Sequence, residues 1–518
     1  MTTAMVTRPT GTSLQCLTEQ AWERLGTESL LRFEGDAFTG AELAMRARRL
    51  SQGLRDAGLQ AGDRVVVCMA NCPEVGLTYS AVWRAGAVTT PVLFLLSEDE
   101  LRHVLRDSEA SYVVTTADFL PKVLAAAGGL PTVRGVVVAG GHETAEQGVP
   151  LLDFAELEQA AEGELVDRSP SALAALLYTG GTTGRSKGVM LSHDAMSAAG
   201  WAVVDADTQS GQQPLTRSLL PLPLSHAYGL MLTVMAVHAT EPGTTVLMRW
   251  FEPAGWLQLA ERHQVQVSAL VPSMLQMLLA NAIEDYDLSA LQRLASGAAP
   301  LPPDVAEQLA RRLPGVEISE GYGLTESAAI ISTSPRGAAR LGSVGRPVSI
   351  VDVRIEQSDG SPTAAGVDGE ICVRGPNVMT GYWNAADATA HALREGWLHT
   401  GDIGRFDEDG YLYVVDRIKD LIIRGGINVY PRDIEDALIA HPDIVGAGVV
   451  GKPDQRMGEE VVAFVQLQPG ATLTADDVVS YARTRLSTAK YPRDVRIVNA
   501  LPLTSVLKLD RKALRAQL

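Results

Sequence analysis

Cysteine is scarce in this sequence, and its spacing excludes a disulfide-based fold. Only Cys16, Cys68, Cys72 and Cys372 occur among 518 residues, and no two of them form a CxxC pair. We therefore expect free thiols in a reducing, cytoplasmic setting. Cys68 and Cys72 have the spacing of a helical metal site, but no histidine accompanies them in the sequence, which disfavours that interpretation.

Positive charge and long apolar runs are also scarce. Lysine and arginine total 44 against 61 acidic residues, a net charge of −17. This balance disfavours nucleic acid as a partner, although small anionic substrates need only local positive groups. No apolar run reaches the roughly 18 residues of a membrane span, and the first 13 residues lack the apolar core of a signal peptide. We expect no nucleic-acid partner and no membrane span. The sequence is compatible with a homodimer.

Aromatic residues make up 5% of the chain against 46% apolar residues, which favours aliphatic cores. Residues 39–165 alternate between helix and strand patterns, with strands expected at 64–70, 110–116 and 133–139. Thr39 with Glu42, and Ser97 with Glu100, form capping boxes that start helices. Such alternation indicates an α/β fold with largely parallel sheets covered by helices.

The composition changes between residues 410 and 420. Strand-rich, turn-punctuated segments precede this stretch, and about 100 residues with their own helix and strand signals follow it. We predict a large N-terminal domain over residues 1–416 that includes a β-rich subdomain. A small, mobile α+β domain is predicted over residues 417–518.

The most informative stretch spans residues 174–192. An apolar strand pattern stops at Thr-Gly-Gly-Thr-Thr-Gly (179–184), and Lys187 then opens a second apolar strand. Glycines let the backbone turn tightly with its N–H groups directed at a ligand, while threonine hydroxyls and a lysine can donate to a polyphosphate. The Walker pattern is not matched, because Gly188 rather than Ser or Thr follows the lysine.

This run resembles the phosphate loop of the adenylate-forming superfamily, which includes acyl-CoA synthetases, luciferases and peptide-synthetase adenylation domains. Further motifs follow in the superfamily's order, so the resemblance covers about residues 15–518: PLPLSHAYG at 221–229, SGAAPL at 296–301, EGYGLTE at 320–326, WLHTGD at 397–402 and DRIKD at 416–420. The resemblance implies an acid–thiol ligase, which joins a carboxylic acid to coenzyme A through an acyl-adenylate. It also implies ATP, or a preformed acyl-AMP, and Mg²⁺.

The resemblance assigns nucleotide binding to the loops that follow several strands. The residues are Thr179, Gly180, Gly181, Thr182, Thr183, Gly184, Gly297, Ala298, Ala299, Gly321, Tyr322, Gly323, Asp402 and Arg417. A carboxylate such as Asp402 accepts two hydroxyl hydrogen bonds, which suits a ribose diol. Glu326 and Thr183 are expected to hold Mg²⁺, which prefers oxygen ligands and bridges polyphosphates.

The resemblance also assigns catalytic, acyl-binding and conformational roles. Catalysis falls to Lys508, His226, Lys187 and Thr325, with Lys508 joining the substrate carboxylate to the α-phosphate. Lys419 is the expected hinge. The acyl pocket is assigned to His226, Val271, Met274, Gly323 and Ala328, and the coenzyme A tunnel to Gly425 and Gly426.

One departure from the family pattern falls directly before the catalytic lysine. Leu507 stands where glycine is usual, and a non-glycine residue at positive φ costs about 1–2 kcal/mol. We therefore expect a weakened adenylation step with an intact thioester-forming step, so that a separate adenylating enzyme would supply acyl-AMP. The alternatives are a complete ATP-dependent synthetase that tolerates Leu507, a freestanding enzyme that loads a carrier protein, and an inactive binding protein.

Overall fold

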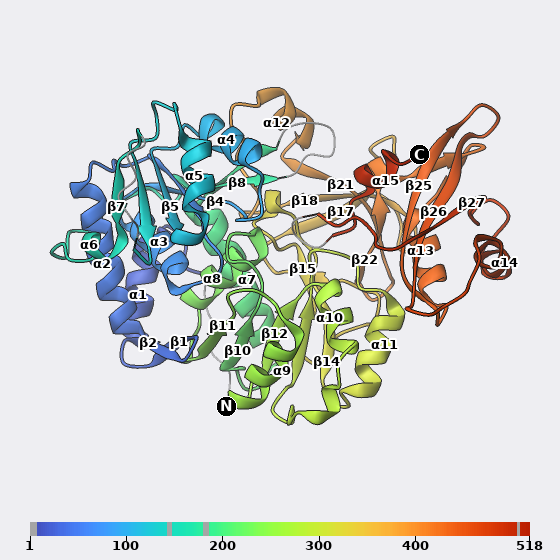
Figure 1. Cartoon of the computed structure of the whole chain (residues 1–518), viewed down its shortest axis with the longest axis horizontal. Coiled ribbons are helices and arrows are strands. Elements are labelled where there is room, and N and C mark those ends of the chain that lie inside the picture. Colours follow the sequence, from blue (N-terminus) through green and yellow to red (C-terminus); the bar gives the residue numbers. More distant parts are fainter. Residues whose placement is uncertain (1–7, 142–147, 180–185, 505–507) are drawn as a thin grey trace.

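The computed structural model describes residues 8–141, 148–179, 186–504 and 508–518. The chain forms two mostly parallel sheets, an antiparallel subdomain and a C-terminal α+β domain (Figure 1). The α/β class, the β-rich subdomain and the small C-terminal domain predicted from the sequence are confirmed. Within the described residues, no helix combines the length and apolar character needed to cross a bilayer.

An eight-stranded sheet forms the first layer, and its strands are parallel except at the end formed by β8, β9 and β19. The apolar runs at 64–70, 110–116 and 133–139 form β3, β5 and β6 within it. In sheet order, the strands are β19 (Gly381–Tyr382), β9 (Lys187–Ser192), β8 (Leu173–Thr179), β4 (Val88–Pro91), β3 (Arg64–Cys68), β5 (Tyr112–Thr116), β6 (Gly135–Ala139) and β7 (Leu151–Asp153).

A seven-stranded sheet forms the second layer and is parallel except for its β1–β2 hairpin. It carries the strands that end at the SGAAPL and EGYGLTE motifs. In sheet order, they are β14 (Glu317–Glu320), β13 (Arg293–Ser296), β12 (Val267–Leu270), β10 (Arg217–Leu220), β11 (Thr244–Leu247), β1 (Ser29–Phe33) and β2 (Asp36–Thr39).

Helices cover both sheets, and one continuous apolar core joins the two layers. Both predicted capping boxes are present, at the starts of α2 and α4. The helices are α1 (Leu14–Leu25), α2 (Gly40–Asp56), α3 (Pro73–Arg84), α4 (Glu98–Asp107), α5 (Leu120–Ala127), α6 (Phe154–Leu157), α7 (His193–Thr208), α8 (Ala227–Val237), α9 (Pro253–Arg262), α10 (Pro272–Leu279), α11 (Pro303–Arg312) and α12 (Ala386–Ala392), with short 3₁₀ turns η1 (Ala117–Phe119), η2 (Ile283–Asp285) and η3 (Thr325–Ser327).

The β-rich subdomain is antiparallel and has a small core of its own. Its strands are β17 (Asp352–Glu356), β18 (Gly369–Arg374), β21 (Trp397–Phe406), β20 (Leu393–Arg394) and β22 (Leu412–Arg417), and the pair β15 (Ser332–Thr333) and β16 (Arg346–Pro347) lies apart from them.

The C-terminal domain lies at one end of the molecule, coloured orange to red in Figure 1. Its sheet packs on α13 and α14 around a separate apolar core. Its elements are η4 (Ile418–Asp420), β23 (Ile422–Arg424), β24 (Ile427–Val429), α13 (Pro431–Ile439), β25 (Ile444–Asp454), β26 (Gly458–Leu467), α14 (Ala475–Arg485), β27 (Asp494–Val498) and α15 (Arg511–Arg515). The boundary between residues 416 and 417 stays a prediction.

Candidate active site

A continuous cavity of about 2320 Å³ opens between the second sheet, the β-rich subdomain and the C-terminal domain. Strands β13 and β14 end at it, and β21 and β22 carry residues of its wall. Loops at the carboxyl ends of parallel strands commonly hold ligands, because the strands fix the loops from below. The cavity continues between the second sheet and helices α7 and α8.

The loops after β13 and β14 form one wall of the cavity. Residues 297–299 and 321–323, which the sequence assigns to the nucleotide, all line it. A Cβ atom at Gly323 would stand 2.3 Å from the carbonyl carbon of Ala329, so no other residue fits without backbone movement. At Gly297 a Cβ atom would stand 3.0 Å from the Tyr228 ring. Neither position has room for a side chain unless its neighbours move.

Three alanines near this wall have left-handed backbone conformations. The φ angles are 68° at Ala298, 49° at Ala328 and 70° at Ala329. Such geometry is uncommon for residues other than glycine and costs of the order of 1 kcal/mol or more at each position. The surrounding packing holds these turns in a fixed shape.

Asp402 presents a buried carboxylate from β21 and is only 2% exposed. Its Oδ2 accepts a hydrogen bond of 2.7 Å from the Tyr322 hydroxyl, and its Oδ1 lies 2.9 Å from Arg417 Nε. Burial raises the pKa of Tyr322, and the adjacent Asp402 carboxylate raises the pKa of Arg417. The structure thus brings Tyr322 together with Asp402, which lies 80 positions further along the chain, and with Arg417.

Tyr382 lies between Lys187, which follows the phosphate loop, and Glu326 of the EGYGLTE motif. Tyr382 donates a hydrogen bond of 2.8 Å to Glu326 Oε1, and Lys187 Nζ lies 5.3 Å from the centre of its ring. Lys187, Glu326, Thr325 and Thr179 all line the cavity. Five further predicted residues lie outside the described part of the chain: Gly180, Gly181, Thr182, Thr183 and Gly184.

Lys508 reaches the same cavity from the C-terminal domain. Burial, with the neighbouring cations Arg417 and Lys419, lowers its pKa to about 8, while Asp402 and Glu326 oppose this shift. The lysine is therefore largely protonated at neutral pH and surrounded by groups of both signs. Leu507 lies outside the described residues.

His226 stands at the N-terminus of α8, where its Nδ1 accepts a 3.3 Å hydrogen bond from the Tyr228 N–H. Burial, with a smaller effect from the Lys508 charge, lowers the pKa of His226 to about 3. The imidazole is consequently neutral at physiological pH. It can orient a carboxylate or shield it from water, and it adds no positive charge.

Helix α10 presents different residues to the cavity from those expected. Val271, Met274 and Ala328 are buried, and they are not among the residues that line the main cavity. Ser273 and Gln276 line it instead, one helical turn apart on the opposite side of α10. Apolar side chains of α7 and α8 supply much of the remaining wall: Val203, Val204, Met231, Leu232 and Met235.

The predicted hinge residue and the predicted tunnel residues lie in different surroundings. Lys419 lies in η4 and lines the cavity. Gly425 and Gly426 form the exposed tip of the β23–β24 hairpin, outside the cavity lining, with φ angles of 58° and 79°. This arrangement of the C-terminal domain presents Lys508, and not the glycine pair, to the cavity.

Several residues of the site have no assigned role in the sequence motifs. Tyr228 and Tyr382 belong to this group, as do Glu320 and Arg432 at the junction with the C-terminal domain. Burial raises the pKa of Glu320 to about 7. Tyr228 and Glu320 carried a usable signal, because both lie within recognised motifs, at 221–229 and 320–326. Tyr382 and Glu326 are distant in the sequence, so their contact could not be predicted before the fold was known.

Sequence comparison identifies two matching families along the chain. Residues 17–383 match the AMP-binding enzyme model, and residues 433–508 match the model of the AMP-binding enzyme C-terminal domain. A feruloyl-CoA synthase of Amycolatopsis sp is 37% identical over 490 residues, 94% of this chain and 95% of that protein. A long-chain-fatty-acid–CoA ligase of Bacillus subtilis is 33% identical over 97% of this chain and 94% of its own length.

Structure comparison gives the same result. The ATP-bound MatB from Rhodopseudomonas palustris superposes with a TM-score of 0.88 at 30% identity, covering 98% of this chain and 99% of that structure. The similarity therefore spans both domains.

Proposed function

The chain belongs to the AMP-binding enzyme family of adenylate-forming acyl-CoA ligases, and from this premise we propose that it is a complete ATP-dependent acyl-CoA synthetase for an uncharged, largely apolar acid. Acyl-CoA ligases of this family form the thioester through an acyl-adenylate. One observation carries the proposal: Lys508 reaches a cavity already lined by Asp402, Arg417 and Glu326.

In the first half-reaction, a carboxylate oxygen of the acid attacks the α-phosphorus of ATP, and pyrophosphate leaves. Protonated Lys508 stabilises the negative charge on the carboxylate and α-phosphate, and Thr325 donates to the same phosphate. His226 orients the carboxylate as a neutral imidazole. Asp402 and Arg417 hold the ribose, and Tyr322 packs against the purine.

The described residues fit a magnesium ion beside the phosphates. Glu326 lies on the cavity wall, and Tyr382 fixes the position of its carboxylate through the hydrogen bond to Oε1. Carboxylate oxygen is the ligand that this hard cation prefers. Glu326, with Thr183, would hold the ion, which would neutralise charge on the departing pyrophosphate.

In the second half-reaction, the coenzyme A thiol loses its proton to solvent, its sulfur attacks the acyl carbon, and AMP leaves with the electrons of the broken acyl–oxygen bond. Rotation of the C-terminal domain about Lys419 would withdraw Lys508 and bring Gly425 and Gly426 to the cavity. The exposed position of this hairpin is compatible with such a movement.

The apolar wall formed by α7 and α8 supports an apolar acyl group. Relatives differ in the acyl group that their names give, feruloyl in one and long-chain fatty acyl in another. We propose an aryl-substituted or aliphatic monocarboxylic acid as the substrate class. Small diacids are disfavoured, because the wall formed by α7 and α8 is largely apolar.

The weakened adenylation expected from Leu507 has less support than complete synthesis. The family comparisons support formation of acyl-CoA through the adenylate and supply nothing for a separate adenylating partner. An enzyme that carries out only the thioester-forming step, here called a half-ligase, therefore becomes the second candidate. It rests only on Leu507 in the sequence.

The deciding experiment compares two substrate forms in the presence of coenzyme A. The purified protein receives either a panel of acids with Mg·ATP or the matching synthetic acyl-AMP, and the Leu507→Gly variant runs alongside. We expect both forms to yield acyl-CoA, with the ATP-dependent rate of Leu507→Gly within a few-fold of the original. Product from acyl-AMP alone, with ATP use restored by Leu507→Gly, would instead establish the half-ligase. Replacing coenzyme A by a phosphopantetheinylated carrier protein tests the remaining alternative.

A further inference from the structure

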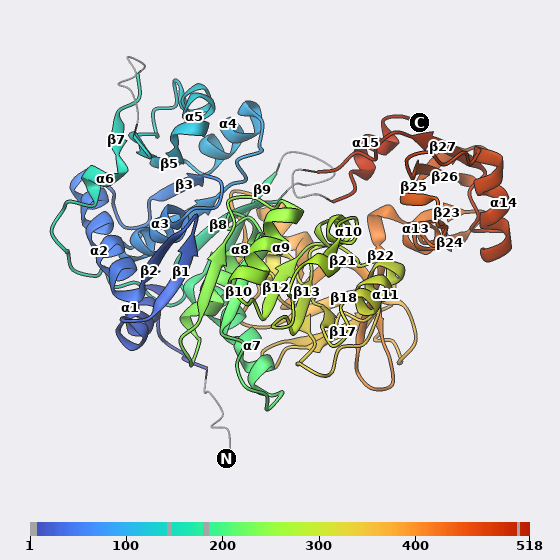
Figure 2. The ribbon, with the colours of Figure 1, turned by 60° about the horizontal axis from the view of Figure 1, so that its bottom comes forward.

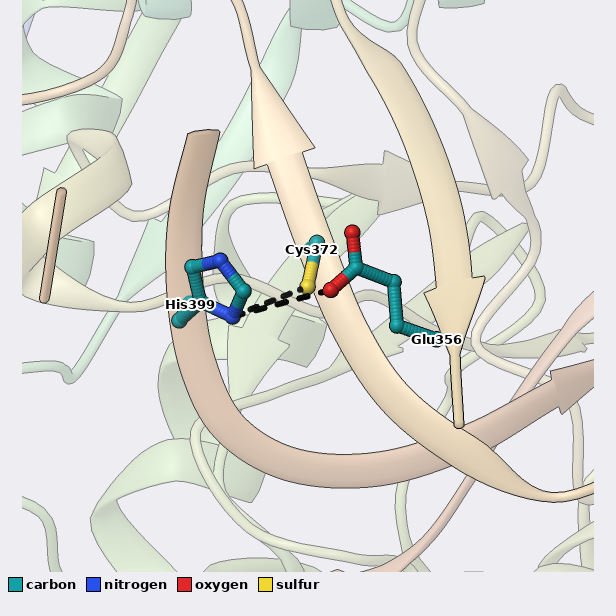
Figure 3. A group of neighbouring side chains, drawn as sticks. All are labelled: Glu356, Cys372 and His399. Atoms are coloured by element: carbon teal, nitrogen blue, oxygen red, sulfur yellow. Dashed lines mark hydrogen bonds and ion pairs between the residues drawn. The ribbon is translucent and has the colours of Figure 1, made fainter. Parts of the chain in front are cut away.

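A cluster of metal-ligating side chains lies in the β-rich subdomain, beside the nucleotide cavity and separate from Glu326. Glu356, Cys372 and His399 project toward one another from strands β17, β18 and β21 (Figure 3). Their ligand atoms all lie within 4.8 Å of one another. Glu370 adds a fourth group, with its Oε2 2.9 Å from His399 Nδ1.

The sheet register explains why these four residues converge. Cys372 pairs directly with His399 across β18 and β21, and Glu356 pairs directly with Glu370 across β17 and β18. Glu370 and Cys372 are two positions apart on one strand, so their side chains share a face of the sheet. Three hydrogen-bonded strands therefore hold the four ligand positions.

The distances are those of a small coordination sphere. His399 Nδ1 lies 3.3 Å from Cys372 Sγ, 2.9 Å from Glu370 and 4.0 Å from Glu356 Oε2. Zinc bound to nitrogen, oxygen and sulfur at 2.0–2.3 Å in a tetrahedron separates neighbouring ligand atoms by about 3.3–3.6 Å. The three distances from His399 Nδ1 bracket this range.

We propose that Glu356, Glu370, Cys372 and His399 form a structural zinc site that ties β17, β18 and β21 together. One thiolate, one imidazole and two carboxylates suit zinc, whereas Mg²⁺ and Ca²⁺ prefer oxygen alone. Glu356 and Cys372 are 6% and 0% exposed, so the ion is enclosed. Glu370 and His399 also line the cavity, which gives the ion an entry route.

Two arginines compensate the carboxylates without the ion. Arg354 pairs with Glu356, and Arg394 Nη2 lies 3.4 Å from Glu370 Oε2. Zinc must compete with both, so removing one positive charge should tighten binding. The Arg394 side chain is 48% exposed, which makes Arg394→Ala a mild change that leaves all four ligands present.

Cobalt titration tests the site without reference to activity. Chelator-treated, dialysed full-length protein receives Co²⁺, which replaces zinc and gives a thiolate-to-metal charge-transfer band. We expect one equivalent to bind with this band, Zn²⁺ to displace it, and Cys372→Ser to abolish it. His399→Gln should weaken binding at least tenfold, and Arg394→Ala should strengthen it severalfold. The matched control Cys16→Ser, which changes a thiol in α1, should keep the band.

Thermal unfolding gives a second readout. Zinc should raise the Tm of the original chain and leave the Tm of Cys372→Ser unchanged, since a ligand that binds only the folded state stabilises it. The proposal is overturned if the original chain gives no thiolate band, or if the band survives Cys372→Ser. It also fails if the band depends on Cys16. If Cys372→Ser does not fold, His399→Gln and Arg394→Ala decide the question.

Discussion

Changes at Lys508 should distinguish the two half-reactions most clearly, because this residue is proposed to act in adenylation alone. Its cationic neighbours Arg417 and Lys419 and its burial hold its pKa at about 8, within reach of ordinary buffers. A lysine that stabilises negative charge works only when protonated. Its contribution should therefore be nearly full well below pH 8 and decline as the pH rises through that value.

We predict that ATP–pyrophosphate exchange falls above about pH 8 while thioester formation from acyl-AMP does not share this decline. Lys508→Arg should extend exchange to higher pH, because guanidinium stays charged. Lys508→Ala should lower exchange by about 10²–10³-fold below about pH 8, and by a smaller factor above it. Lys452→Ala, at an exposed lysine of the same domain, is the control. Normal exchange by Lys508→Ala would remove this residue from the mechanism.

At the scale of elements, the turn between β14 and η3 contains two glycines with different surroundings. A Cβ atom at Gly323 meets the backbone of Ala329 at 2.3 Å, whereas one at Gly321 meets Ser332 O at 3.4 Å, an ordinary contact. Since overpacking of this kind costs about 1–3 kcal/mol, the two positions form a matched pair within one turn.

We predict that Gly323→Ala weakens ATP binding and lowers the Tm by several degrees, while Gly321→Ala changes both much less. Calorimetric titration with ATP and thermal unfolding measure the two effects. Equal behaviour of the two variants would show that the close approach of Ala329 relaxes at little cost.

The same scale shows what could be predicted from the sequence. Strands β3, β5, β6 and β8 were readable as apolar runs, and the capping boxes of α2 and α4 as short motifs, because these signals are local. The cavity-facing side of α10 was not readable. An apolar residue such as Met274 fits a core or a pocket equally well, and only the packing of the helix decides between them.

For the whole molecule, the junction between the domains is the feature that the sequence could not supply. Helix α13 lies beside β22 (Figure 2), where Arg432 Nη1 donates to Val414 O at 2.6 Å and its backbone N–H donates to Asp416 at 3.1 Å. The motifs around Asp416 and Lys419 were readable because they are contiguous. Contacts between residues from two domains leave no such pattern.

We predict that Arg432→Ala lowers the adenylation rate about tenfold and affects thioester formation less. The side-chain bond to Val414 exists in the arrangement that presents Lys508 to the cavity, so its loss should disfavour that arrangement. Single-turnover measurements of each half-reaction test this, with exposed Arg456→Ala as control. A larger loss in the thioester step would contradict the expected role.

Acid sensitivity is a second property of the whole molecule. Burial lowers the pKa of His193 and His238 to about 4, and neither His193 ring nitrogen has a hydrogen-bond partner among the described residues. Below about pH 6.5 these two imidazoles bind protons in the unfolded chain, whereas in the folded chain they stay neutral down to about pH 4. The contribution of these histidines to stability is therefore complete above about pH 6.5 and is lost as the pH falls toward 4, by up to about 3 kcal/mol per histidine.

We predict that His193→Gln changes the pH dependence of the Tm between pH 7 and pH 5, so that less stability is lost at the acidic end. The exposed His391→Gln should leave it unchanged. Thermal unfolding at half-unit pH intervals measures the effect, and an identical pH dependence for His193→Gln would exclude His193 as its source.

The left-handed alanines near the nucleotide wall bear on how this protein can evolve. Ala298, Ala328 and Ala329 all have left-handed backbone conformations, which few other side chains tolerate. A rim of this kind cannot reshape itself around a different base, and a ligand that fits it loses little conformational freedom from the protein. Single side-chain changes in the proposed acyl wall of α7 and α8 should therefore alter the acyl specificity far more readily than changes in these loops alter the nucleotide preference. A change of nucleotide would require rebuilding the loops themselves.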